Sequence, residues 1–167
     1  MRKIMPFTPV HMGPGILIKA IFQGSFSLMV FGWTQILMDI QPLVVLITGE
    51  GHLHGFSHTF LGGSLIAVIA AITGKYLAEL GLKILSLGKQ PVIIFWPVAF
   101  LSAFTGSFSH VWLDSIMHTD VEPFYPVFLY NHFHGLVSVA VLHKLCLYSG
   151  LFGTGLYFLV SWRTGKQ

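Results

Sequence analysis

Five apolar stretches dominate this sequence, at residues 10 to 22, 25 to 40, 57 to 87, 91 to 117 and 135 to 162. A helix crosses a bilayer with about 20 residues, so each of the last three stretches is long enough to span it. The first two are shorter and are joined only by Gln23-Gly24, which favours a helical hairpin; an interfacial amphipathic helix is the alternative for the first. Because proline disfavours a helical conformation at the residue before it, we expect the second helix to end before Pro42.

The composition fits lipid better than water as the solvent. Charged residues make up 9% of the 167 residues and hydrophobic residues 54%, whereas soluble domains carry about 25% charged residues. With no internal repeat or linker, the sequence predicts one domain over residues 1–167, an all-α integral membrane bundle of about five helices with the first two forming a short hairpin. The net charge of +3 gives little support to nucleic-acid binding. The single cysteine, Cys146, reads as a small buried hydrophobic residue.

Nine histidines stand out in a chain this apolar. Because successive helices alternate in direction, eight of the histidines and most of the acids are expected at one end of the bundle. His110 and Asp114 are spaced i, i+4, so both project from one helix face. Asp114 and His118 share that spacing if the helix continues, as do His54 and His58 if theirs starts early. The side chains expected at this end are His11, Asp39, His52, His54, His58, His110, Asp114, His118, Asp120, Glu122, His132 and His134.

An imidazole and a carboxylate on one helix face are a common way to hold zinc or another divalent ion. Asp39 lies in an apolar segment, where an unpaired charge near lipid would cost several kcal/mol, so a metal or a buried partner would explain it. For His110 and Asp114 the alternative is an interhelical hydrogen bond without metal. For His52, His132 and His143, the alternative is an ordinary polar residue at the membrane interface.

The basic residues predict how the chain is oriented. The N-terminal residues start like a signal peptide but lack its long apolar run, so we expect no cleaved signal. In the five-helix arrangement most basic residues lie on one side of the membrane. Loops rich in lysine and arginine stay in the cytoplasm. We therefore expect the histidine-rich end of the protein to be extracytoplasmic. Lys144 fits poorly and must reach the interface or face the bundle. Six basic residues (Lys19, Lys75, Lys83, Lys89, Arg163 and Lys166) oppose two (Arg2 and Lys3).

Two segments resemble a known family. The segment Ser109-His110-Val111-Trp112-Leu113-Asp114-Ser115, followed by Pro123 and Pro126, resembles the S-H-x-x-x-D-S … P signature of the membrane-bound, metal-dependent hydrolases, which include the LexA-regulated inner-membrane hydrolases. The segment 54–59, His-Gly-Phe-Ser-His-Thr, resembles that family's H-R-G-x-[ST]-H-[ST] block, without its arginine and with the histidines one position closer. The family has an acidic motif, often with two aspartates, where Asp39 stands alone, and an N-terminal histidine at the place of His11. The resemblance implies a metal site of His11, Asp39, His58, His110 and Asp114, to which the spacing in this chain adds His118 and Asp120 as candidates. It also implies a location in the bacterial inner (cytoplasmic) membrane.

These observations predict a membrane-embedded hydrolase that depends on a divalent metal, with zinc as the expected ion. Asp120, Glu122 or an unligated histidine such as His54 is the expected general base. A site at the ends of membrane helices suits a lipid or lipid-linked substrate, cleaved at a phosphoester or ester bond. The alternatives are a metal-ion transporter, a non-catalytic metal-binding membrane protein, and bis-histidine haem binding by His58 and His110.

Overall fold

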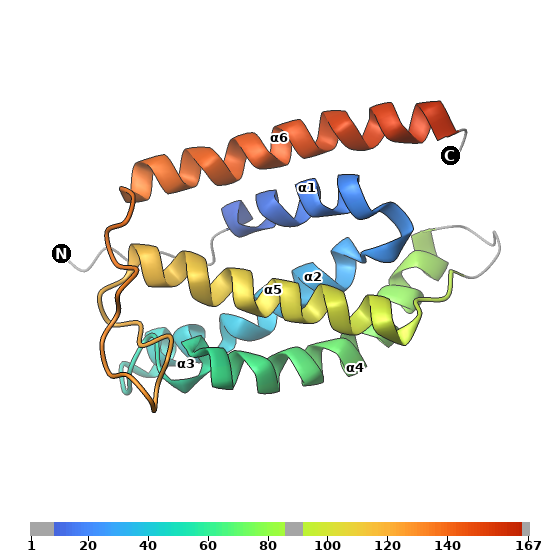
Figure 1. Cartoon of the computed structure of the whole chain (residues 1–167). Helices are drawn as coiled ribbons and strands as arrows, with labels where there is room; N and C mark the ends of the chain where they lie inside the picture. The colour runs from blue at the N-terminus through green and yellow to red at the C-terminus, as the bar shows by residue number, and fades with distance from the viewer. Residues whose placement is uncertain (1–8, 86–91, 165–167) are drawn as a thin grey trace.

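The computed structural model describes residues 9–85 and 92–164, and every regular element in them is helical (Figure 1). The prediction of an all-α helical bundle is confirmed. Short 3-10 turns at Pro9–His11, Gln23–Ser25 and Phe56–His58 precede or join the α-helices. The α-helices are α1 (Met12–Phe22), α2 (Leu28–Met38), α3 (Ile40–Thr48), α4 (Phe60–Leu85), α5 (Trp96–Met117) and α6 (Val139–Thr164).

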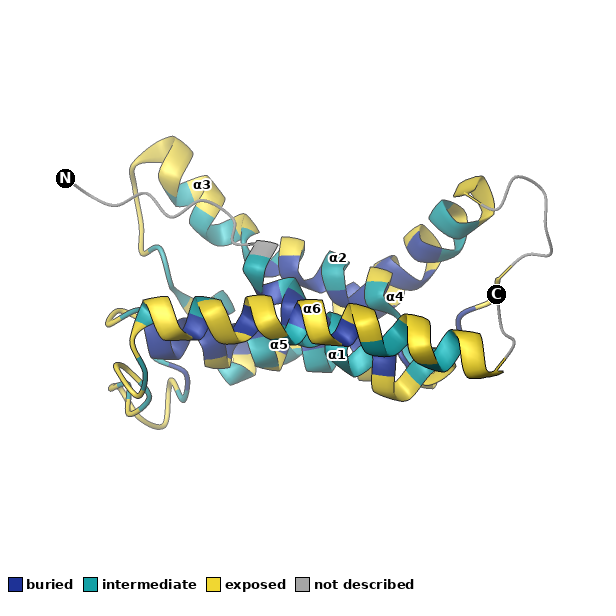
Figure 2. Cartoon of the chain, turned by 90° about the horizontal axis from the view of Figure 1, so that it is seen from above, coloured by how far each residue is buried: buried dark blue, intermediate teal, exposed yellow. Residues whose placement is uncertain are grey.

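Three helical segments are long and apolar enough to cross a membrane: Leu28–Thr48, Phe60–Leu85 and Val139–Thr164. Their outer surfaces expose large apolar side chains such as Leu65, Ile69 and Leu151, and Figure 2 shows exposed residues along the outside of α3, α4 and α6. Soluble monomeric proteins rarely expose this much contiguous apolar surface to water. We conclude that the chain is an integral membrane protein.

The fourth apolar stretch, α5, is not among these three segments. Its 22 residues are long enough for a bilayer, but α5 packs against α2 and α4 and buries polar side chains such as Ser102, Ser107 and Ser115. Polar side chains are tolerated on the faces of α5 that contact other helices, while Leu101, Phe108 and Trp112 keep its exposed face apolar. The central position of α5 therefore explains why its composition is more polar.

The second helix, α2, ends at Met38 and so before Pro42, as predicted, but a further helix that was not predicted follows it. The chain turns only at Asp39 and then forms α3, so that α2 and α3 together make the span of 21 residues. Pro42 is the third residue of α3, and the first turn of a helix tolerates proline because its N–H groups have no partner within that helix. If α2 and α3 are counted as one membrane span, the bundle has the five helices that were predicted.

The first two helices form the expected hairpin, but α1 packs mainly against α6 (Figure 1). Glycines make this contact possible. A Cβ atom on Gly13 would collide with the carbonyl oxygen of Cys146, and one on Gly153 would lie 2.6 Å from the Cα atom of Leu17. Such close backbone approach through small residues is typical of helix pairs in membranes.

Replacing Gly13 with alanine is therefore expected to lower the free energy of unfolding by about 1–3 kcal/mol, because one of two packed backbones must shift. The matched control is Gly155→Ala on α6, where an added Cβ would meet nothing within 4 Å. Thermal unfolding in mild detergent, followed by circular dichroism, measures both. Equal melting temperatures for the two variants would contradict the glycine-mediated contact.

Basic residues mark the end of the bundle opposite the histidines. Lys19 lies in the last turn of α1, Lys83 in that of α4 and Arg163 in that of α6. Lys144 is exposed on α6, so it does not face the interior of the bundle. The remaining alternative is that its side chain reaches the membrane interface. The positions of Arg2, Lys3, Lys89 and Lys166 lie outside the described residues.

Candidate metal centre

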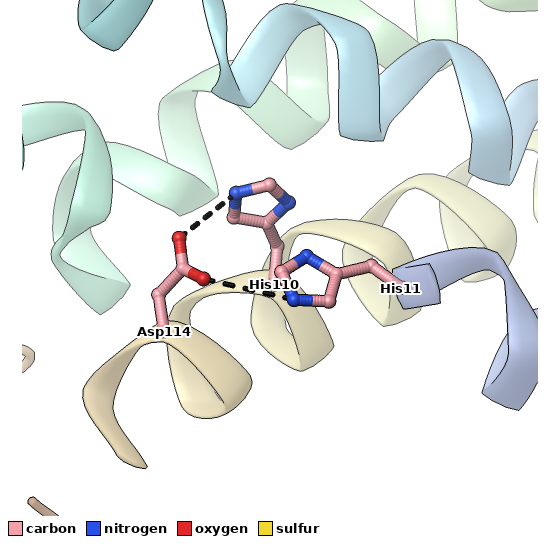
Figure 3. Close-up of side chains that lie close together, drawn as sticks. All are labelled: His11, His110 and Asp114. Carbon is pink, nitrogen blue, oxygen red and sulfur yellow. Dashed lines mark ion pairs between the residues drawn. The ribbon is translucent and has the colours of Figure 1, made fainter. Parts of the chain in front are cut away.

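Four parts of the chain bring polar side chains together at one end of the bundle. His11 closes the turn that precedes α1, Asp39 is the single residue between α2 and α3, and His58 closes the turn before α4. His110 and Asp114 lie one turn apart near the end of α5, and Figure 3 shows the carboxylate of Asp114 facing the rings of both His110 and His11. We call these five residues (His11, Asp39, His58, His110 and Asp114) the core cluster.

The carboxylate of Asp114 is the centre of the core cluster. Its Oδ2 atom lies 3.2 Å from Nε2 of His58 and 3.2 Å from Nε2 of His110. Its Oδ1 atom lies 3.7 Å from Nε2 of His11. Asp114 and all three histidines are buried, so one carboxylate faces three imidazoles away from water.

The imidazole nitrogens that face Asp114 have no hydrogen-bond partner with acceptable geometry, although His11, His58 and His110 are buried. Leaving a buried polar atom unpaired costs about 1–3 kcal/mol, so each such atom calls for an explanation. Two ligands bound tetrahedrally to zinc at about 2.0–2.1 Å are separated by about 3.3 Å. The nitrogen–oxygen distances of 3.2 to 3.7 Å lie around this value, so the core cluster has the donor set and spacing to hold a divalent ion.

Gln35 of α2 sets the orientation of His110. Its Nε2 donates to the carbonyl oxygen of Gly106 at 2.9 Å, so its Oε1 accepts from Nδ1 of His110 at 2.7 Å. With the proton on Nδ1, the lone pair of His110 lies on Nε2 and points into the core cluster. The side-chain oxygen of Ser57 lies 2.9 Å from Nδ1 of His58 and can orient that ring in the same way. Such outer partners hold metal-binding histidines in many proteins.

Asp39 is the most accessible member of the core cluster. Its Oδ1 lies 3.4 Å from Nε2 of His110, and its side chain is 23% exposed, against 6% for Asp114. The turn between α2 and α3 places it at the boundary of the cluster. Access to an ion held there is therefore on the side of Asp39 or along the neighbouring loops.

A second group, the outer cluster, consists of His54, His118 and Asp120. Nδ1 of His54 lies 2.9 Å from Oδ2 of Asp120, and the rings of His54 and His118 stack with centroids 4.3 Å apart. Each residue offers a ligand atom, and these atoms all lie within 4.8 Å of one another. Loops and turns therefore bring together residues that lie 66 positions apart in sequence.

Helical spacing does not explain the outer cluster. α5 ends at Met117, and His118 is extended with φ −120° and ψ 131°, so the expected common face of Asp114 and His118 does not form. α4 begins at Phe60, so the expected helical pairing of His54 with His58 is also wrong. Both histidines still reach the site because the chain turns there: the His54 and His58 rings lie 5.0 Å apart.

Charge and burial affect the outer cluster in two ways. Burial lowers the pKa of His118 below its ordinary value, so this imidazole is neutral near pH 7 and keeps a lone pair free. Burial alone would raise the pKa of Asp120, but the hydrogen bond with His54, the charge interactions with His54 and His118 and a backbone hydrogen bond together outweigh it and leave the pKa below its usual range. Asp120 is therefore an anion at neutral pH. The general-base role expected for His54 or Asp120 stays a prediction.

A polar pocket of about 260 Å³ adjoins the outer cluster. Asp120 belongs to both, and Glu122, Tyr130, Asn131 and His134 also line the pocket. The side chain of Asp120 is 54% exposed, so solvent reaches this part of the site. The pocket gives the outer cluster a place for a polar molecule or headgroup.

The remaining histidines differ in their surroundings. His52 and His132 are exposed, which agrees with the interpretation as polar interface residues. His143 of α6 differs from them, because its Nε2 is buried without a hydrogen-bond partner. Nothing in the spacing of α6 had marked it. A haem between His58 and His110 would have to displace Asp114, which lies 3.2 Å from both.

Comparison of the chain with models of protein families, with curated proteins and with solved structures finds no match.

Proposed function

We propose that this protein is a membrane-embedded hydrolase that depends on a divalent metal, with zinc as the first candidate, held by the core cluster. The observation that carries the proposal is the group of three buried imidazole nitrogens, without hydrogen-bond partners, around the single buried carboxylate of Asp114. A structural hydrogen-bond network would pair these nitrogens. A ligand set leaves their lone pairs free.

The core cluster and the outer cluster have different roles in this proposal: the first binds the metal, and the second is accessible to the substrate. The core cluster holds the ion and is buried except on the side of Asp39, while Gln35 keeps Nε2 of His110 directed inward. A divalent cation bound there supplies Lewis acidity and lowers the pKa of a coordinated water. The outer cluster and its pocket are accessible, so the scissile bond is expected at the border between the clusters.

The position of the site suggests the substrate. It lies at the ends of apolar helices that can cross a bilayer, where a lipid headgroup would be found. The neighbouring pocket is polar and small. We therefore favour a lipid or lipid-linked substrate cleaved at a phosphoester bond, with a carboxylic ester as the second choice. Lys19, Lys83 and Arg163 at the opposite end support an orientation with the metal end outside the cytoplasm, and we propose the bacterial inner membrane as the location.

The test is turnover by the protein purified in mild detergent, with zinc bound or removed by a chelator. Phosphate monoesters, phospholipids and diacylglycerol are offered, and released phosphate and fatty acid are measured. We expect turnover of one class, lost at least about 100-fold on chelation or in Asp39→Asn, because the ion supplies several kcal/mol of transition-state stabilisation. Glu50→Gln, an exposed acid in a loop, is the control.

Turnover that survives chelation would overturn the proposal, as would zinc binding with no turnover of any substrate. Zinc-dependent uptake by proteoliposomes without turnover would favour the transporter. Among the described residues, however, the possible metal-binding groups all lie at one end of the bundle, whereas a transport path places polar groups across the membrane.

A further inference from the structure

We infer that the outer cluster of His54, His118 and Asp120 binds a second divalent cation, adjacent to the first. The inference rests on the proposed function and deepens it, since it makes the site a two-metal centre. In this role Asp120 is a ligand and not the general base that its sequence suggested.

The donor set supports a metal site that is open to solvent. Two imidazoles and one carboxylate offer ligand atoms within 4.8 Å of one another. Three protein ligands with one open position are typical of catalytic zinc sites, whereas structural zinc is closed by four. The exposure of Asp120, at 54% of its side chain, leaves the open position toward the pocket.

A hydrogen-bonded pair without metal explains less of this arrangement. His54 and Asp120 alone would account for their distance of 2.9 Å. They would not account for His118, whose ring stacks on that of His54 with an interplanar angle of 26°. A shared ion explains why a second imidazole is brought close to the same carboxylate.

The outer cluster lies next to the core cluster. His54, His58 and Asp114 also form a group whose ligand atoms all lie within 4.8 Å of one another. His58 and Asp114 belong to the core cluster, so the two candidate sites meet at these residues. Two-metal hydrolases hold their ions about 3.5–4 Å apart, where the pair stabilises both the attacking and the leaving oxygen of the reaction.

The charges of the two sites fit an anionic substrate. The core cluster contains two carboxylates, Asp39 and Asp114, which balance one divalent ion. The outer cluster contains one, Asp120, so an ion there keeps a net positive charge. This charge is accessible from the polar pocket and would attract a phosphoryl group more strongly than a neutral ester.

The experiment is the zinc stoichiometry of the purified full chain, measured by mass spectrometry of the metal after equilibration and gel filtration. We expect two zinc ions per wild-type chain and one in His118→Ala and in Asp120→Asn. His132→Ala removes an exposed histidine at the same end and is expected to retain two. Circular dichroism of each variant verifies that the helices remain.

A second measurement, which like the first does not depend on activity, tests whether the two ions are neighbours. With Mn²⁺ in place of zinc, two neighbouring ions give a spin-coupled electron paramagnetic resonance signal, and one ion gives an isolated signal. One zinc per wild-type chain with an uncoupled signal would overturn the second site and leave the proposed function standing. No zinc at all would overturn both, and two ions in all three variants would place the second ion elsewhere.

Discussion

Replacing Asp114 with asparagine is expected to weaken zinc binding to the core cluster by at least about 100-fold. The substitution keeps the shape of the side chain but removes the charge that faces His11, His58 and His110. Loss of a group that only orients a metal ligand already costs about 10–100-fold in affinity, and Asp114 is the shared central carboxylate. Titration against a zinc-binding dye, in mild detergent, measures the affinity.

The same substitution separates metal binding from folding. A ligand at 1,000 times its dissociation constant stabilises the native state by about 4 kcal/mol. Zinc should therefore raise the melting temperature of the wild type and of the control Glu50→Gln, and raise that of Asp114→Asn clearly less, because only the outer cluster is then left to bind an ion. If Asp114→Asn binds zinc as tightly as the control does, the core cluster is a hydrogen-bond network and not a metal centre.

Much of the fold follows from the lengths of the apolar stretches. Their number and alternation predicted the helices, because a chain in lipid must satisfy its backbone hydrogen bonds within each helix. The boundaries were less accurate where proline lies near a helix end. Pro42 was taken as a stop but lies in the first turn of α3, and the fourth helix begins at Trp96, five residues later than expected.

The core cluster could be predicted from the sequence because its members lie at helix ends. Alternating helix directions bring such positions together whatever the packing, and the spacing of His110 and Asp114 fixes their common face. Gln35 could not be found in this way, because its role depends on how α2 contacts α5. The outer cluster depends on loop conformation. The helical spacings of His54 with His58 and of Asp114 with His118 did not predict it, because neither His54 nor His118 lies in a helix.

Replacing Glu79 with leucine is expected to destabilise the protein by about 3 kcal/mol, because it leaves Lys75 buried without its charge partner. Lys75 is only 8% exposed, and its ammonium donates to Oε1 of Glu79 one turn along α4. The same carboxylate oxygen accepts from the backbone N–H of Ile94 at 2.8 Å, which ties α4 to the segment before α5. Chemical unfolding in mild detergent measures the change.

A double variant distinguishes lost charge pairing from lost packing. In Lys75→Met with Glu79→Leu no charge is left buried, so most of the stability should return, except about 1 kcal/mol for the unpaired N–H of Ile94. If both side chains were exposed to water, a pair one turn apart on a helix would contribute only about 0.3–0.5 kcal/mol. A single-variant loss of that smaller size would show that Lys75 reaches water. A double variant as unstable as Glu79→Leu would assign the loss to the contact with Ile94, because removing the second charge would then have restored nothing.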